Sequence, residues 1–212
     1  MQTSDKDRDV LGMRVTAFDW EEALQALDSG LDSGHNQRIV NFLNANNANI
    51  AYGNPSYRAA LAASDMLLPD GIGMDIAAKA IAGEAFPANL NGTDFIPALL
   101  IHIDRPLKVA LIGGSREAVE QAAINFTKLA PWHEFRAISD GYFGEAGTER
   151  VKQDLAAFAP DFTLVAMGSP LQELWINGNI GPEHGRLVMG VGALFDFVSG
   201  QIPRAPQWVR DL

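Results

Sequence analysis

Short apolar runs alternate along the chain with longer segments in which apolar residues recur at helical spacing. In the clearest run, KVALIGG, the apolar residues follow one another without interruption and end in two glycines. A run that is apolar throughout, rather than at every second position, is typical of a strand buried on both faces of a parallel sheet. The pattern predicts strands at residues 11–18, 38–44, 65–69, 108–114, 135–141, 161–168 and 186–192.

The segments between these runs carry signals of helix starts and ends. Ser115 and Thr93 can cap helices, and Gly83 can end one. Helices are predicted from Trp20 to Leu31, from 47 to Asn54, at 55–63, 73–83 and 94–103, after Ser115, and at 148–158 and 171–177. This alternation predicts one α/β domain over residues 10–212, a Rossmann-like parallel sheet with helices on both faces. Residues 1–9 are polar and are expected to form a disordered lead.

The composition limits the possible partners and chemistry. A net charge of −10 over 212 residues argues against nucleic-acid binding, which needs a basic surface. No cysteine is present, so disulfides, thiolate metal sites and cysteine nucleophiles are excluded. No uncharged apolar run approaches the roughly 20 residues that span a bilayer. The sequence lacks H-E-x-x-H, and the acid-x-acid patterns within 5–9 make a poor metal clamp, so no metal site is expected. We expect a cytoplasmic protein, either soluble or peripheral on a membrane.

Polar residues and glycines gather where the predicted strands end. They are Asn44, Asp70, Gly113-Gly114-Ser115, Asp140-Gly141-Tyr142, Gly168-Ser169 and Gly190-Val191-Gly192. The carboxyl ends of parallel strands share one edge of a sheet, and ligands of open α/β sheets bind there. The sequence therefore predicts a functional edge at these residues.

The stretch LLPDGIG puts Asp70 at the mouth of a buried strand, with two glycines behind it. One interpretation is a turn that also caps the next helix. The other is a general base, since a carboxylate fixed at a strand end can accept a proton from a bound substrate. The spacing alone leaves both open.

Gly113 and Gly114 precede a predicted helix whose first amides can bind an anion, such as the phosphates of a nucleotide diphosphate. A tight turn without a ligand is an equal alternative. Asp140 could bind ribose hydroxyls or simply form a turn. Neither G-x-G-x-x-G nor a P-loop occurs, so the dinucleotide fingerprint is incomplete.

Further candidates follow in the second half of the chain. Gln172 and Glu173 stand in the first turn of a predicted helix, where they can face a pocket, although glutamate is favoured there in any helix. Asp196 lies between two phenylalanines, and a carboxylate in such a run has a partner, a function or a solvent-facing position. Tyr142 could stack on a base or sugar, or pack in the core.

In order and spacing, these segments resemble one family, the WecG/TagA/CpsF bacterial glycosyltransferases. The resemblance covers the chain from about residue 11 to its end. Its landmarks are FLNANNANIA, LLPDGIG, NGTDF, LIGG, DGYF, MGSPLQE and GVGALFDFVSGQIPRAPQW.

The resemblance implies an inverting, metal-independent transfer of a sugar from a UDP-sugar to a polyprenyl-diphosphate-linked acceptor. No cofactor is implied beyond the donor, and the enzyme would be peripheral on the inner face of the plasma membrane, where it could form a homo-oligomer. Asp70 would be the catalytic base. The residues expected to bind substrate, from the pattern or the resemblance, are Asn44, Asn89, Gly113, Gly114, Tyr142, Gly168, Gln172, Glu173, Gly192 and Asp196.

The sequence also departs from the family pattern. Asn89 stands where many members have arginine, and Phe42 where many have threonine. The neutral residue resembles the GumM-like branch of exopolysaccharide synthesis, so glucose is the expected donor sugar. Transfer of N-acetylmannosamine or its uronate is the alternative. The segment 204–208 resembles the start of a helix that the family continues into a membrane-associating tail, so we expect the domain to lack that tail.

Two other functions stay open. Gly113, Gly114 and Asp140 would also suit an NAD-dependent oxidoreductase. A nucleotide-sugar-binding module without catalysis would need the same glycine turns but no base at Asp70.

Overall fold

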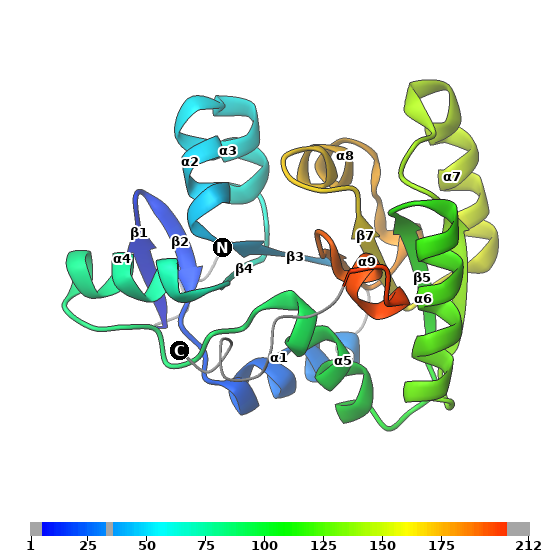
Figure 1. Ribbon diagram of the computed structural model, residues 1–212, viewed down its shortest axis with the longest axis horizontal. Coiled ribbons are helices and arrows are strands. Elements are labelled where there is room, and N and C mark those ends of the chain that lie inside the picture. The colour runs from blue at the N-terminus through cyan, green and yellow to red at the C-terminus, as the bar shows by residue number, and fades with distance from the viewer. Residues whose placement is uncertain (1–5, 33–35, 203–212) are drawn as a thin grey trace.

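A computed structural model describes residues 6–32 and 36–202, and its centre is a parallel sheet of six strands (Figure 1). The strand order is β4-β3-β8-β7-β5-β6, and every neighbouring pair is parallel. The strands are β3 (Arg38–Leu43), β4 (Met66–Pro69), β5 (Lys108–Gly113), β6 (Glu134–Ser139), β7 (Phe162–Ala166) and β8 (Leu187–Gly190). The predicted α/β, Rossmann-like sheet is confirmed.

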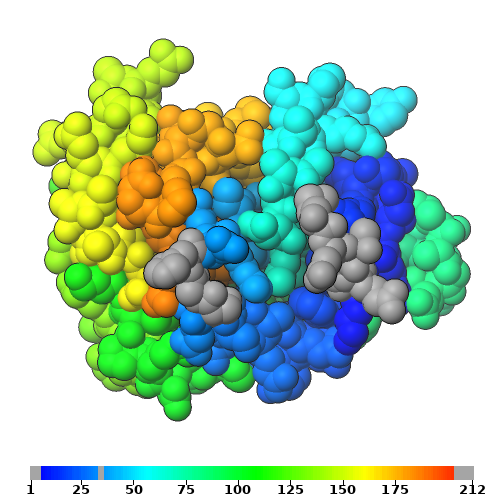
Figure 2. Space-filling model, turned by 180° about the vertical axis from the view of Figure 1, so that it is seen from behind, coloured from blue at the N-terminus to red at the C-terminus, as the bar shows by residue number. Residues whose placement is uncertain are grey.

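Helices cover both faces of this sheet (Figure 1). One face packs against α1 (Trp20–Asp32), α5 (Gly92–His102), α6 (Arg116–Leu129) and α9 (Leu194–Ser199). The other side carries α2 (Ala45–Gly53), α3 (Pro55–Ala62), α7 (Gly144–Phe158), α8 (Leu171–Asn179) and a short 3-10 turn, η1 (Pro182–His184). The last helix, α4 (Ile72–Ala82), lies at one end of the molecule in both views (Figure 1 and Figure 2).

Strand β5 illustrates why the buried strands are apolar throughout. Val109 and Leu111 belong to the core on the α5 and α6 side, whereas Ala110 and Ile112 belong to the core on the α7 and α8 side. Successive side chains of a strand point to opposite faces, and here both faces are covered. All four side chains are fully buried.

The N-terminal region differs from the prediction. Instead of a disordered lead followed by a strand at 11–18, β1 (Asp7–Val10) and β2 (Met13–Thr16) form a separate antiparallel pair. Val10, Met13 and Val15 are buried, and they pack against α2, α3 and α4. The disordered lead is therefore wrong for β1, while residues 1–5 lie outside the described part of the chain.

Several helix starts also differ from the prediction by a few residues. Helix α2 begins at Ala45 and α7 begins at Gly144. The cap of α5 is Asn91, whose side chain accepts a hydrogen bond from the Asp94 amide, and not Thr93. Thr93 instead donates its hydroxyl to Asn91 Oδ1, at 2.8 Å, so the predicted cap supports the actual one. These shifts leave the order of the elements as predicted.

Candidate active site

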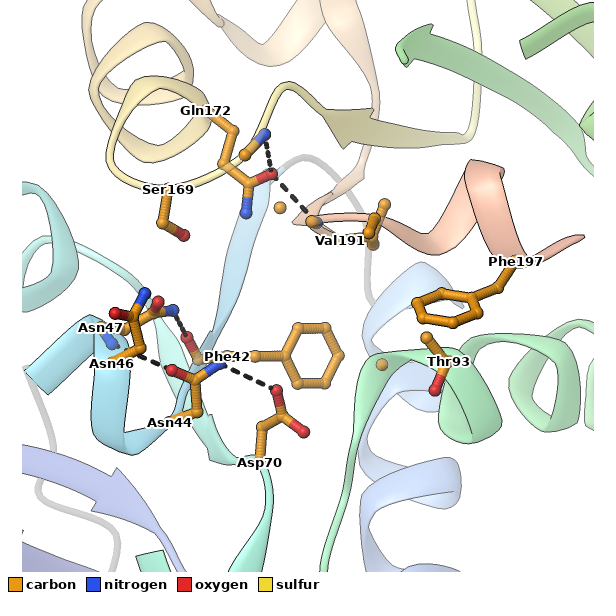
Figure 3. A pocket seen from close by; sticks show the side chains of 15 residues that line it. Phe42, Asn44, Asn46, Asn47, Asp70, Thr93, Ser169, Gln172, Val191 and Phe197 are labelled. Atoms are coloured by element: carbon orange, nitrogen blue, oxygen red, sulfur yellow. Dashed lines mark hydrogen bonds between the residues drawn. The ribbon is translucent and has the colours of Figure 1, made fainter. Parts of the chain in front are cut away.

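A cavity of about 350 Å³ opens at the carboxyl ends of β3, β4, β7 and β8 (Figure 3). The strand ends are adjacent because β4-β3-β8-β7 are neighbours in the sheet. The lining residues are Phe42, Asn44, Asn46, Asn47, Asp70, Gly92, Thr93, Gly168, Ser169, Gln172, Gly190, Val191, Gly192, Ala193 and Phe197.

Asn44 and Asp70 face each other across the ends of β3 and β4 (Figure 3). The Asn44 side chain donates from Nδ2 to Asp70 Oδ2, at 3.2 Å. Its other atom, Oδ1, accepts from the Asn47 amide at 2.9 Å and so caps α2. One amide side chain therefore both starts a helix and positions the carboxyl of Asp70, which fixes the orientation of that amide.

The environment of Asp70 favours its protonated form. Burial raises the pKa of the Asp70 carboxyl above its ordinary value, and the hydrogen bond from Asn44 partly opposes this rise. A carboxyl with a raised pKa is a stronger base once it is ionised, which is the property a general base requires.

The backbone around Asp70 is held by its neighbours in space. The Asp70 amide donates to the Leu43 carbonyl at 2.9 Å, which extends the pairing of β3 and β4 by one residue. The next amide, of Gly71, donates to Asn89 Oδ1 at 2.8 Å. Asn89 is exposed and does not line the cavity, so its contact in the structure is with the turn that carries Asp70.

Gln172 joins two glycine turns on the opposite side of the cavity (Figure 3). Its Oε1 accepts from the Gly168 amide at 3.2 Å and from the Gly192 amide at 3.0 Å. Both glycines have positive φ, of 76° and 56°, a backbone region that favours glycine. The turns after β7 and β8 are thus tied to each other by one side chain.

A second cavity, of about 310 Å³, adjoins the first. The two share Gly168, Gly192 and Ala193. The second is also lined by Gly114, Gly141, Tyr142, Ala166, Met167, Leu171 and Asp196. At Gly114, the Cβ of a larger residue would lie 3.9 Å from Asp196 Oδ1, so the Asp196 carboxyl stands close to the turn between β5 and α6.

The structure brings most of the predicted site residues to these two cavities. The first is lined by Asn44, Asp70, Gly168, Gln172 and Gly192, and the second by Gly114, Tyr142, Gly168, Gly192 and Asp196. Asn89, Gly113 and Glu173 line neither. Gly113 packs against β7, since a Cβ there would lie 2.2 Å from the Ala166 carbonyl oxygen. Whether each residue binds substrate stays a prediction.

Sequence reasoning missed several lining residues. Asn46 and Asn47 lie in NANNANIA, where the repeated asparagines were an available signal. Phe42 precedes the strand end, and Phe197 follows Asp196 (Figure 3). Phe42 was considered only as a departure from a family pattern, although its ring forms part of the wall.

The described residues contain neither a cluster of metal ligands nor a helix that could span a membrane. In residues 6–32 and 36–202, no three His, Asp or Glu side chains gather closely enough to hold a metal ion. Within the same ranges, no helix has both the length and the apolar character needed to cross a membrane.

The fold and the cavities define an α/β protein of Rossmann-like architecture, with its candidate site at the carboxyl edge of a parallel sheet. The Glycosyl transferase WecG/TagA/CpsF family matches residues 8–212. The chain therefore belongs to the WecG/TagA/CpsF family of glycosyl transferases, and the resemblance stated from its motifs is confirmed.

Two curated relatives share one name, N-acetylglucosaminyldiphosphoundecaprenol N-acetyl-beta-D-mannosaminyltransferase. The one from Bacillus spizizenii is 32% identical over 158 residues, which are 73% of this chain and 60% of the relative. The one from Bacillus subtilis is 26% identical over 174 residues, which are 81% of this chain and 66% of the relative. The matched region is thus about three fifths to two thirds of these relatives' length.

Proposed function

We propose that the protein transfers N-acetylmannosamine from its UDP-linked donor to N-acetylglucosamine on a polyprenyl diphosphate, with inversion at the anomeric carbon. Family membership and the activity that both relatives are named for support this reaction class. The observation that carries the proposal is the pair of joined cavities, with Asp70 on one and glycine turns on both.

In the proposed mechanism, Asp70 is the general base. The acceptor hydroxyl occupies the first cavity, and the ionised carboxylate takes its proton as the oxygen attacks the anomeric carbon. Asn44 holds the carboxylate in place through its Nδ2 hydrogen bond. The bond from the anomeric carbon to the diphosphate breaks on the opposite face, so the product is inverted and UDP leaves.

The donor's UDP occupies the second cavity in this proposal. Gly114 lies one residue before the Ser115 cap of α6, and the first amides of a helix favour an anion. The turns at Gly168 and Gly192 border both cavities. The donor's sugar would therefore lie beside these turns, between UDP in the second cavity and the acceptor in the first. No metal takes part in the proposed reaction, which would occur at the cytoplasmic face of the membrane.

The donor sugar is where the proposal departs from the expectation of glucose. That expectation rested on a neutral Asn89 in place of arginine. Asn89 Oδ1 binds the Gly71 amide, and the side chain lies outside both cavities, which weakens Asn89 as a donor-selecting residue. Both relatives are named as mannosaminyltransferases, so N-acetylmannosamine is the better supported donor.

An NAD-dependent oxidoreductase is less well supported. Asp140, the acid that would bind ribose hydroxyls, accepts a hydrogen bond from the Tyr142 amide at 2.9 Å. Asp140 lines neither cavity, in contrast to its neighbours Gly141 and Tyr142. The turn interpretation of Asp140 therefore accounts for its contacts without a ligand.

A donor screen tests the proposal. The purified chain is incubated with UDP-N-acetylmannosamine, UDP-glucose or NAD and with a short polyprenyl-diphosphate N-acetylglucosamine, with and without EDTA. We expect a β-linked disaccharide from the first donor, unchanged by EDTA. Product from UDP-glucose alone would correct the donor, loss of product in EDTA would contradict the metal-independent mechanism, and binding of NAD in place of UDP would overturn the proposal.

A further inference from the structure

A buried carboxyl lies behind the wall of the first cavity. Glu173, on α8, is 1% exposed and lines neither cavity, although its neighbour Gln172 lines the first. Successive residues of a helix are about 100° apart around its axis, so one can face a cavity while the next faces the core. A buried carboxyl needs hydrogen-bond partners, and those of Glu173 lead back to the cavity.

One oxygen of this carboxyl accepts two hydrogen bonds. Ser169 donates its hydroxyl to Glu173 Oε1 at 2.6 Å, and Gln172 donates its Nε2 to the same oxygen at 3.0 Å. Gln172 Oε1 in turn accepts from the amides of Gly168 and Gly192. The carboxyl is thus joined through one amide group to the two turns that border both cavities.

The orientation of the Gln172 amide matters because its two ends are chemically opposite. The oxygen accepts hydrogen bonds, whereas the nitrogen only donates them. If the amide were turned over, its NH2 group would face two N–H donors, and both glycine amides would lose their partner. An acceptor at Glu173 Oε1 therefore selects the orientation that keeps the two turns joined.

We propose that Glu173 is a positioning residue that orients the Gln172 amide and thereby fixes the turns at Gly168 and Gly192 relative to each other. The consequence for donor binding rests on the proposed function, since these turns would border the diphosphate. The role of Glu173 in orienting the Gln172 amide does not depend on the proposed function.

The surroundings of Glu173 agree with this assignment. Burial raises the pKa of its carboxyl, while the hydrogen bond from Ser169 works against that rise. Its second oxygen, Oε2, is buried and makes no hydrogen bond of regular geometry, and the neighbouring Tyr57 hydroxyl also works against the rise in the pKa. The two hydrogen bonds at Oε1, from Ser169 and Gln172, are therefore the regular contacts that hold this buried carboxyl in place.

Space around the amide is also limited. At Gly190, the Cβ of a larger residue would lie 2.5 Å from Asn41 Oδ1 and 3.0 Å from Gln172 Nε2. The side chain of Gln172 is itself only 3% exposed. The amide therefore has little freedom once Glu173 accepts its NH2 group, and a glycine is needed beneath it.

The experiment compares Glu173→Leu with Glu173→Gln. Leucine fills similar space but cannot accept a hydrogen bond, whereas glutamine keeps a neutral acceptor. In the ¹⁵N-labelled protein, we expect Glu173→Leu to speed exchange of the Gly168 and Gly192 amides by roughly tenfold, as for a lost hydrogen bond. The Gly114 amide, which bonds to the Ala166 carbonyl at 2.8 Å, is the internal control and should not change. Glu173→Gln should behave as the unaltered chain.

Unchanged exchange at both glycines in Glu173→Leu would overturn the inference, as would an effect of equal size in Glu173→Gln. If Glu173→Leu does not fold, the unaltered protein still decides, because the Gln172 NH2 protons should exchange slowly, and fast exchange would contradict the contact. UDP titration is the separate readout, with roughly tenfold weaker binding expected in Glu173→Leu. If the unaltered chain binds no UDP, the proposed function fails while the amide exchange still tests Glu173.

Discussion

Asp70 and Glu173 are both partly or fully buried carboxyls near the ends of parallel strands, yet their surroundings differ. Asp70 follows β4 and faces the first cavity with one hydrogen bond, from Asn44. Glu173 lies in α8, faces away from the cavity and accepts from Ser169 and Gln172. Burial raises the pKa of both carboxyls. A raised pKa alone therefore does not identify a general base, because only Asp70 is accessible to a ligand in the first cavity.

Replacing each carboxyl by its amide gives the largest contrast. Asp70→Asn should lower the rate of sugar transfer by roughly 10²–10⁴-fold, because a general base is lost, and should leave UDP affinity nearly unchanged. Glu173→Gln should keep most of the transfer. Turnover and calorimetric UDP binding are measured on both variants. Equal losses of transfer in the two variants would contradict the different roles assigned to Asp70 and Glu173.

Two glycines show a similar contrast, because Gly192 lines both cavities whereas Gly113 packs against β7. Gly113→Ala places a Cβ 2.2 Å from the Ala166 carbonyl oxygen at a φ of 119°, so we expect the variant to lose its stable fold. Gly192→Ala meets open space at a φ of 56° and should cost about 1 kcal/mol. Denaturant unfolding of both variants measures this. Equal midpoints would mean that the turn after β5 is not packed as described.

A smaller effect is expected from removing the hydrogen bond that Asn44 donates to the Asp70 carboxyl. Asn44→Ser keeps a helix cap but removes the amide that lowers the pKa of Asp70. The acid limb of kcat/KM should therefore move to higher pH, since the base must be ionised. Asn46→Ser, in the same cavity wall, is the control and should leave the limb in place. An unmoved limb in Asn44→Ser would count against Asp70 as the titrating base.

The smallest expected effect is on stability. The pKa of folded Asp70 is raised above 3.8, so its contribution to stability is fully present at lower pH and is lost as pH rises through the raised pKa. Asp70→Asn removes that loss, and its unfolding temperature should exceed that of the unaltered chain at about pH 7. The gap should narrow toward about pH 4. A gap that is constant with pH would show that burial does not penalise this carboxylate.

The sequence predicted the sheet well because its strands carry a clear signal. Residues 109–114 are apolar throughout, a pattern typical of a strand covered on both faces. Strand β1 was missed because Asp7, Arg8 and Asp9 follow one another in it and resemble a polar lead. The strand order was not predictable, since it depends on which non-local strands pair.

The site was predicted less completely, for a geometric reason. Asn44 and Asp70 directly follow their strands, so the order of the strands along the chain already places them at the edge of the sheet. Gln172 and Glu173 are neighbours on a helix, and the pattern of residues does not show which of them faces the cavity. Residues of the flanking helices, such as Phe197, reach the cavity only because of how those helices pack on the sheet. The predicted helix start at 204–208 lies outside the described residues.

In the proposed mechanism, the two adjoining cavities hold the donor and the acceptor, with Asp70 on the acceptor side. A crystal structure of the chain with bound UDP would show which cavity holds the nucleotide. We predict uridine and phosphates in the cavity lined by Gly114 and Asp196, with the diphosphate end at Gly168 and Gly192 and the Asp70 carboxyl uncovered. UDP seated against Asp70, or outside both cavities, would contradict the account.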